Sequence, residues 1–143
     1  MAESWPLVGR AEELVRAVEL CGGGGVLISG PPGVGKTRLA AEVVDTLATS
    51  EARPVLRVRA TDASSRMPLG AFAQVLGART GLAAGRSGLL PADADRISAL
   101  AAHLTSGLTS DDRLVLSVDD VHVLDDTSAT LLLQLVLDGR VSV

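Results

Sequence analysis

The sequence predicts an α/β fold in which helices cover both faces of a parallel sheet. Short apolar runs of strand length alternate along the chain with segments whose apolar residues recur at helical spacing. A glycine-rich octapeptide follows the first of these runs, and two acidic residues end another. Because ligands of such folds bind beyond the carboxyl ends of the strands, both features are expected at one edge of the sheet. A length of 143 residues is enough for one domain with its own core.

The N-terminal half is expected to hold two helices and two strands. A short helix is predicted over residues 10–20, and a cysteine and four glycines separate it from an apolar run at 26–29 that predicts a buried strand. A longer helix ends near Ser50, and residues 54–60 alternate apolar and arginine side chains, as is typical of an edge strand. The apolar residues expected to face the core are Leu14, Val15, Val18, Leu39, Val43, Leu47, Leu56, Val58 and Ala60.

The C-terminal half continues this alternation of helices and strands. The expected elements are a helix at 69–79, a loop at 80–90, a helix at 93–108, a central strand at 114–118, a helix capped by Asp126, Thr127 or Ser128 and ended by Gly139, and a strand that begins at 140–143. Asp125 and Asp126 are interpreted as turn and helix-cap residues rather than metal ligands. The apolar residues expected on the helices are Leu69, Phe72, Ala73, Leu76, Ile97, Leu100, Ala101, Leu104, Leu108, Leu131, Leu132, Leu135 and Val136.

The glycine-rich octapeptide fits the phosphate-binding loop pattern G-x-x-x-x-G-K-[ST]. Its residues are Gly30, Pro31, Pro32, Gly33, Val34, Gly35, Lys36 and Thr37. Lys36 is the only lysine in the chain, and it stands where a compact charge must reach the β- and γ-phosphates. The backbone N–H groups of residues 33–37 are expected to face the phosphates, and the Thr37 hydroxyl to ligate Mg²⁺. Arg38 is expected either near the phosphates or exposed, and an ordinary glycine-rich turn is the alternative for the whole loop.

The apolar run at 114–118 ends in Asp119 and Asp120, the acids expected opposite a phosphate-binding loop. A carboxylate at a strand tip orients Mg²⁺ near the loop threonine, and Asp119 is predicted to have this role. An adjacent acid can polarise the attacking water, and Asp120 is the candidate general base. The two roles could also be exchanged between these residues.

Composition argues against several other classes of protein. The formal net charge is −4 and no basic stripe stands out, so this segment is not expected to bind nucleic acid directly. No apolar run approaches the roughly 18 residues of a membrane span, and the N-terminus lacks a secretory signal pattern. The single cysteine, Cys21, forms no internal disulfide and suits a reducing compartment. A cytoplasmic protein without a membrane partner is therefore expected.

The order of the motifs resembles one family of signalling ATPases. The segments concerned are Leu7-Val8-Gly9-Arg10 with Glu13-Leu14, the phosphate-binding loop, Val118-Asp119-Asp120-Val121-His122, Asp125 and Ser128-Ala129-Thr130-Leu131-Leu132. This series is similar to the N-terminal ATPase module of the large ATP-binding LuxR-type transcriptional regulators. Those regulators belong to the STAND class of P-loop ATPases, which is related to AAA+ proteins.

The resemblance implies a three-layer P-loop NTPase with a central parallel sheet of strand order 5-1-4-3-2. It implies ATP or ADP as the ligand, Mg²⁺ as the cofactor, and a place beside the adenine for Val8, Gly9 and Arg10. It assigns residues 1–143 to the N-terminal part of one ATPase domain, with no second domain present.

The sequence departs from the family pattern at two places. Val123 stands where the family commonly has tryptophan, and the sequence stops at Val143, before the family's last strands, lid and regulator domains. A fragment with weakened function is therefore expected, whose partners are the missing C-terminal domains or other subunits.

Three functions remain open from the sequence. The first is a signalling module that binds and hydrolyses ATP, so that its nucleotide state acts as a switch. The second is a remodelling ATPase of the AAA+ type, although such enzymes usually carry Asp-Glu rather than the Asp119-Asp120 pair. The third is a non-hydrolysing module in which ATP only orders the fold.

Overall fold

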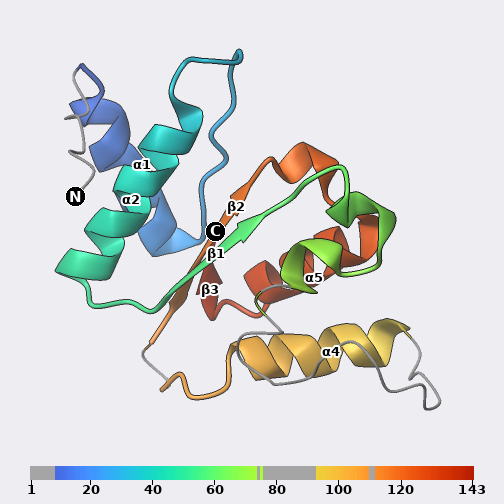
Figure 1. Ribbon diagram of the computed structural model, residues 1–143. Coiled ribbons are helices and arrows are strands. Elements are labelled where there is room, and N and C mark those ends of the chain that lie inside the picture. Colours follow the sequence, from blue (N-terminus) through green and yellow to red (C-terminus); the bar gives the residue numbers. More distant parts are fainter. Residues whose placement is uncertain (1–8, 74, 76–92, 110–111) are drawn as a thin grey trace, which may run out of the picture.

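Three parallel strands form the centre of the molecule, with helices on both faces (Figure 1). This computed structural model describes residues 9–73, 75, 93–109 and 112–143. The strands are β1 (Val55–Arg59), β2 (Leu114–Asp119) and β3 (Val141–Ser142), and they lie in the order β1-β2-β3. Both strand pairs are parallel, which confirms the predicted α/β class with a parallel sheet.

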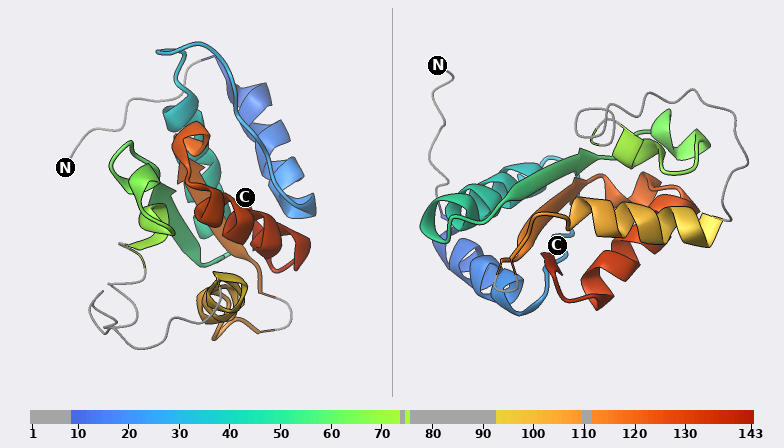
Figure 2. Two further views of the ribbon diagram at one scale, coloured as in Figure 1. Left: turned by 90° about the vertical axis from the view of Figure 1, so that its right-hand side faces the viewer. Right: turned by 90° about the horizontal axis from the view of Figure 1, so that it is seen from below.

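In the described part of the chain, helices pack in pairs on the two faces of the sheet. Helices α1 (Ala11–Gly23) and α2 (Lys36–Ser50) pack together on one face of the sheet. Helices α4 (Asp93–Leu104) and α5 (Asp126–Leu137) pack together on the other face, as the two views of Figure 2 show. Short 3₁₀ turns lie at η1 (Ser64–Arg66), η2 (Gly70–Phe72) and η3 (Val121–Val123). Among the described helices, none combines the length and apolarity needed to cross a lipid bilayer.

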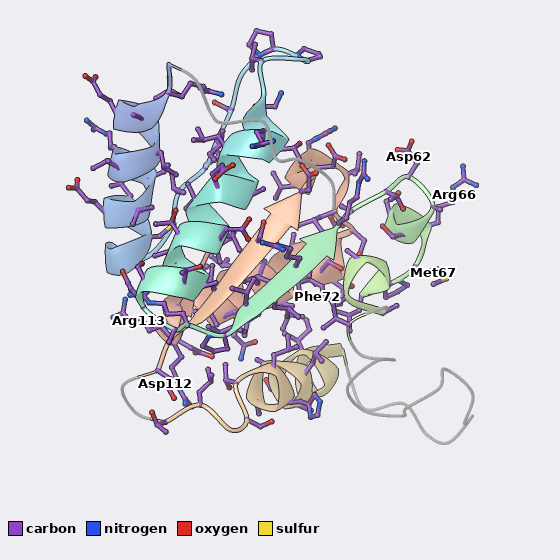
Figure 3. All side chains as sticks on the ribbon, turned by 60° about the vertical axis from the view of Figure 1, so that its left-hand side comes forward. Asp62, Arg66, Met67, Phe72, Asp112 and Arg113 are labelled. Carbon is purple, nitrogen blue, oxygen red and sulfur yellow. The ribbon has the colours of Figure 1, made fainter. Side chains whose placement is uncertain are left out.

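Each face of the sheet has its own apolar core. The larger core lies beneath α4 and α5, and its centre includes Phe72, which is 0% exposed and lies between the sheet and α4 (Figure 3). The smaller core joins α1 and α2 to Val115 of β2. The predicted helical spacing of Leu39, Val43 and Leu47 is confirmed, because all three are buried in this smaller core.

Strand β1 has the alternating pattern expected of an edge strand, and it does lie at one edge of the described sheet. Leu56, Val58 and Ala60 are buried, whereas Arg57 and Arg59 are exposed. The register pairs Val55 with Val115 and Arg59 with Asp119, so the carboxyl ends of β1 and β2 meet. The predicted inner position of β2 is also confirmed.

The predicted strand at residues 26–29 is wrong. These residues have no regular secondary structure, and Leu27 is 77% exposed. Parallel strands form only where a partner backbone runs alongside. Here the pairing consists of two bonds, from the Val26 N–H to the Val143 carbonyl (2.6 Å) and from the Val143 N–H to the Gly24 carbonyl (3.2 Å). Within the described part of the chain, no backbone bond continues this ladder beyond Val26.

The boundaries of the first helix also differ from those predicted. Helix α1 continues through Gly23, so the first three residues of the break expected at 21–25 lie within it. The helix buries Ala17 and Cys21 instead of Val15, which is 59% exposed. The helix therefore packs through a face that includes these two small side chains.

The helix predicted at residues 69–79 is wrong at its start but agrees with the structure at residues 73 and 75, which are helical, although Ala73 is exposed rather than buried. Leu69 has a left-handed backbone (φ 61°), and a 3₁₀ turn follows it at Gly70–Phe72. Leu76 and the expected loop at 80–90 lie outside the described residues. Leu69 and Phe72 are nevertheless buried as expected, because the turn packs them against the larger core.

Two helix boundaries in the C-terminal half are corrected. Helix α4 ends at Leu104, so Leu108 packs against the core from the loop that follows. The N-cap of α5 is Asp125, whose carboxylate accepts a hydrogen bond from the Ser128 backbone N–H, rather than any of the three residues expected. Gly139 has a left-handed φ of 70° just after the helix, in agreement with its predicted stop role.

Candidate functional site

The glycine-rich loop connects residues 24–29 to α2. Gly33 and Gly35 have left-handed φ angles of 80° and 82°. An L-residue with a side chain adopts such angles only with strain, so the loop requires glycine at both positions. Gly35 is also the N-cap of α2, which therefore begins directly at Lys36.

The N-terminus of α2 points toward this loop and gives it a positive character. The first N–H groups of a helix have no acceptor within the helix, and the helix dipole adds partial positive charge there. The Lys36 ammonium lies across the loop and donates to the Pro31 carbonyl at 2.9 Å. Because an ammonium has three donors, this contact leaves others available for an anion. The loop can therefore bind an anionic group such as phosphate.

Thr37 and Asp119 are brought together from positions 82 residues apart. The Thr37 hydroxyl lies 3.4 Å from both carboxylate oxygens of Asp119. Adjacent ligand oxygens of an octahedral Mg²⁺ with bonds of about 2.1 Å lie about 3 Å apart. These two side chains therefore fit a shared cation. The described residues contain no cluster of three or more His, Cys, Asp or Glu side chains that could hold a metal, so water or phosphate oxygens would supply the other ligands.

The two acids at the carboxyl end of β2 point to different partners. Asp120 has a left-handed φ of 55°, and its backbone N–H donates to the Asp119 carboxylate at 3.1 Å. The Asp120 carboxylate lies 3.7 Å from the Arg59 guanidinium at the tip of the neighbouring strand. Asp119 thus faces the loop, while Asp120 faces β1. The ion pair was not expected, since the alternation at residues 54–60 indicated only that Arg59 lies on an edge strand. The signal that could have found it is an arginine at the end of a strand adjacent to one that ends in acids.

Arg10, which directly precedes α1, contacts the loop through its side chain. Arg10 donates to the Val34 carbonyl at 3.0 Å and also to Glu13 at 2.6 Å. Gly9 is exposed, with φ at 81°, and Val8 lies outside the described residues. The resemblance implied a place beside the adenine for Arg10, but its contact with the loop was not expected.

Arg38 directs its guanidinium along α2. It donates to Glu42, one turn later, at 2.9 and 3.1 Å. This geometry is that of an i, i+4 pair on a helix surface. Arg38 thus follows the loop in sequence and pairs with Glu42 on the surface of α2.

A cleft of about 940 Å³ lies along residues 26–30, α2 and the carboxyl end of β2. Lys36, Thr37 and Asp119 line it with polar groups, and aliphatic side chains such as Val43 line the remainder. Ligand pockets commonly have volumes of about 300–1,000 Å³. The cleft is therefore large enough for a small molecule whose charged group lies against the loop.

Asp125 connects the two loops that surround the acidic strand tip. Its carboxylate accepts hydrogen bonds from the Leu69 N–H (3.0 Å), the Ser128 N–H (3.0 Å) and the Ser128 hydroxyl (2.5 Å). Partial burial raises the pKa of this carboxyl, but these hydrogen bonds outweigh that effect and the pKa is lower than the ordinary value of 3.8. The segment after β1 is thereby joined to the start of α5.

The parallel α/β fold, the glycine-rich loop and the acidic strand tip define a P-loop ATPase module. The sequence profile of the AAA ATPase domain matches residues 6–142, and the chain therefore belongs to the AAA ATPase domain family. Membership of this family indicates nucleotide binding and ATPase function. Searches among curated proteins and among solved structures found no match.

Proposed function

We propose that this chain is the ATP-binding and ATP-hydrolysing module of a signalling or transcriptional regulator, in which the nucleotide state acts as a switch. The observation that carries the proposal is the meeting of Thr37 and Asp119 at 3.4 Å beside the Lys36 loop. A structural glycine turn would not require an acid from a distant strand at this position.

Each part of the loop has a proposed role in binding ATP. The backbone N–H groups of residues 33–37 receive the phosphate oxygens, and Lys36 moves from the Pro31 carbonyl toward the β- and γ-phosphates. Thr37 and Asp119 hold Mg²⁺, which neutralises charge on the phosphates when it is bound. The remaining loop residues, Gly30, Pro31 and Pro32, shape the turn that precedes these donors.

Asp120 is the proposed general base, which accepts a proton from the attacking water. Asp120 follows Asp119 at the strand tip and lines the same cleft as Lys36 and Thr37. The ion pair with Arg59 at 3.7 Å competes for this carboxylate. That contact favours the second candidate, a non-hydrolysing module in which ATP only orders the fold.

The more specific parts of the proposal follow the resemblance to LuxR-type regulators of the STAND class. Residues 1–143 form the N-terminal part of one ATPase domain, Val8, Gly9 and Arg10 lie near the adenine, and other domains or subunits of the regulator are the partners. A strand order of 5-1-4-3-2 is proposed for the family sheet. In that numbering the segment at 26–29 is strand 1, and β1, β2 and β3 are strands 2, 3 and 4. The observed order β1-β2-β3, with residues 24–26 bonded to Val143 beyond β3, supports the order 1-4-3-2 within it.

The binding site is tested by titrating the chain with fluorescent ATP, with and without Mg²⁺. Lys36→Ala should weaken Mg²⁺-dependent binding about ten- to hundredfold, because it removes a charge-assisted contact with phosphate. Arg66→Ala is the matched control, since it removes an exposed cation from η1, away from the loop (Figure 3). Equal affinities for wild type and Lys36→Ala would contradict the proposed phosphate site.

Hydrolysis is tested separately by single-turnover measurements with excess protein. Asp120→Asn should abolish hydrolysis while ATP binding is retained, and Asp119→Asn should weaken the Mg²⁺ dependence of binding. Binding without any single-turnover hydrolysis in the wild type would favour the non-hydrolysing module. Formation of a hexamer on addition of ATP would instead favour the remodelling ATPase.

A further inference from the structure

Arg10 contacts the phosphate-binding loop through a backbone carbonyl group of the loop. The Arg10 side chain is 27% exposed and donates to the Val34 carbonyl at 3.0 Å, between the two left-handed glycines of the loop. The Arg10 guanidinium also lies 3.7 Å from the position that a Cβ on Gly35 would take. The Val34–Gly35 peptide is therefore in direct contact with a residue that precedes α1.

This contact fixes the direction of one amide group. In a planar trans peptide the carbonyl and the following N–H point in opposite directions. Because the Val34 carbonyl is bound by Arg10, the Gly35 N–H must point away from Arg10, toward the opposite side of the loop. Gly35, which flanks this peptide, gives it unusual freedom to rotate, so an external donor has a large effect on its orientation.

The guanidinium is itself held in place. Glu13 accepts from Arg10 at 2.6 and 2.5 Å, and Glu13 belongs to the first turn of α1. The Arg10 carbonyl accepts from the Leu14 N–H at 3.0 Å, and α1 packs against α2. Arg10 is thus fixed to the start of α1, and α1 packs against α2, the helix that follows the loop.

We propose that Arg10 is a positioning residue for the phosphate site. It orients the Gly35 N–H toward a bound polyphosphate through the Val34 carbonyl, and Glu13 keeps the guanidinium on that carbonyl. This inference rests on the proposed function, because it concerns the loop assigned above to phosphate. It differs from the adenine role expected for Arg10, since the recognised group is a phosphate and the contact is with the protein backbone.

The test compares ATP with inorganic tripolyphosphate, which has the phosphates but no adenine. Arg10→Met removes the donor and keeps an unbranched side chain of similar length. Arg16→Met is the matched control, because Arg16 is an exposed cation of α1 that has no hydrogen bond or ion pair with the described residues. Calorimetric titrations in the presence of Mg²⁺ give both affinities, and circular dichroism establishes that each variant is folded.

Arg10→Met should lower the affinities for ATP and for tripolyphosphate by the same factor, about three- to tenfold, as expected for the loss of one hydrogen bond. Arg16→Met should leave both affinities within about twofold. The ¹H–¹⁵N resonance of Gly35 should shift in Arg10→Met before any ligand is added, which a role limited to capping α1 would not produce. If Arg10→Met lowered the affinity for ATP alone and left that for tripolyphosphate unchanged, Arg10 would be assigned to the adenine and the proposal would be overturned.

Glu13→Gln separates an indirect role from direct contact with phosphate. If Glu13 keeps Arg10 on the Val34 carbonyl, its neutralisation should weaken tripolyphosphate binding. If Arg10 binds phosphate directly, the same change frees a positive charge and strengthens binding, which would overturn the inference. Equal affinities of wild type and Arg10→Met for tripolyphosphate would overturn this inference alone. If the wild type bound neither ATP nor tripolyphosphate, the proposed function would be overturned as well.

Discussion

Asp125 provides the sharpest test of how the loops at the acidic strand tip are held. Asp125→Ala removes the N-cap of α5, which contributes about 1 kcal/mol. It also leaves the N–H of buried Leu69 without its carboxylate acceptor, which costs about 1–3 kcal/mol. The free energy of unfolding should therefore fall by about 2–4 kcal/mol, and the midpoint of thermal unfolding by roughly 6–15 °C for a domain of this size.

The contribution of Asp125 should also depend on pH. Its pKa in the folded protein lies below the ordinary value of 3.8, so folding favours the ionised carboxylate. The stabilisation is therefore complete above about pH 5, and it is lost as the pH falls below 3.8 through the lower folded value. The difference between wild type and Asp125→Ala should become smaller across that acidic range.

The assay is urea unfolding followed by circular dichroism at several pH values. Asp126→Ala is the control, since Asp126 is exposed in the first turn of α5 and should contribute less than about 1 kcal/mol through the helix dipole. If Asp125→Ala and Asp126→Ala had equal effects at neutral pH, the three hydrogen bonds to Asp125 would not stabilise the fold and the reasoning would be refuted.

Further predictions concern the core and the backbone. Leu131→Ala should lower the free energy of unfolding by about 2–5 kcal/mol, because Leu131 is 0% exposed, whereas Leu133→Ala, at a site 59% exposed, should change it by less than about 0.5 kcal/mol. Denaturant unfolding of the two variants checks this, and similar losses would contradict the burial of Leu131. Gly70→Ala should destabilise the protein by at least about 1 kcal/mol, because a Cβ there would overlap the Ser64 carbonyl. Gly22→Ala should stabilise it by about 0.5–1 kcal/mol, since a Cβ within α1 meets no atom within 4 Å. Thermal melts of the two glycine variants should move in opposite directions, and a shift of both in one direction would disagree with this geometry.

Much of the fold could be predicted because its signals are local. The burial of Leu39, Val43 and Leu47 follows from helical periodicity, and the edge strand β1 follows from the alternation of apolar and arginine side chains. The expected strand at 26–29 failed because an apolar run does not contain its own partner. Strand structure depends on the backbone that lies beside it, and here the pairing stops at Val26.

The candidate site shows the same division. The sequence by itself determined the glycine loop with Lys36, because that motif depends on neighbouring residues and on the backbone freedom of glycine. The motifs also predicted that Asp119 would lie near Thr37, but only the tertiary structure decided the geometry of that meeting and the contact of Arg10 with the loop. The distance of 3.4 Å between Thr37 and Asp119 depends on the sheet that places β2 beside α2. The contact of Arg10 with Val34 depends in the same way on the packing of α1 against α2. Such contacts join residues far apart in the chain, so no local pattern specifies their geometry.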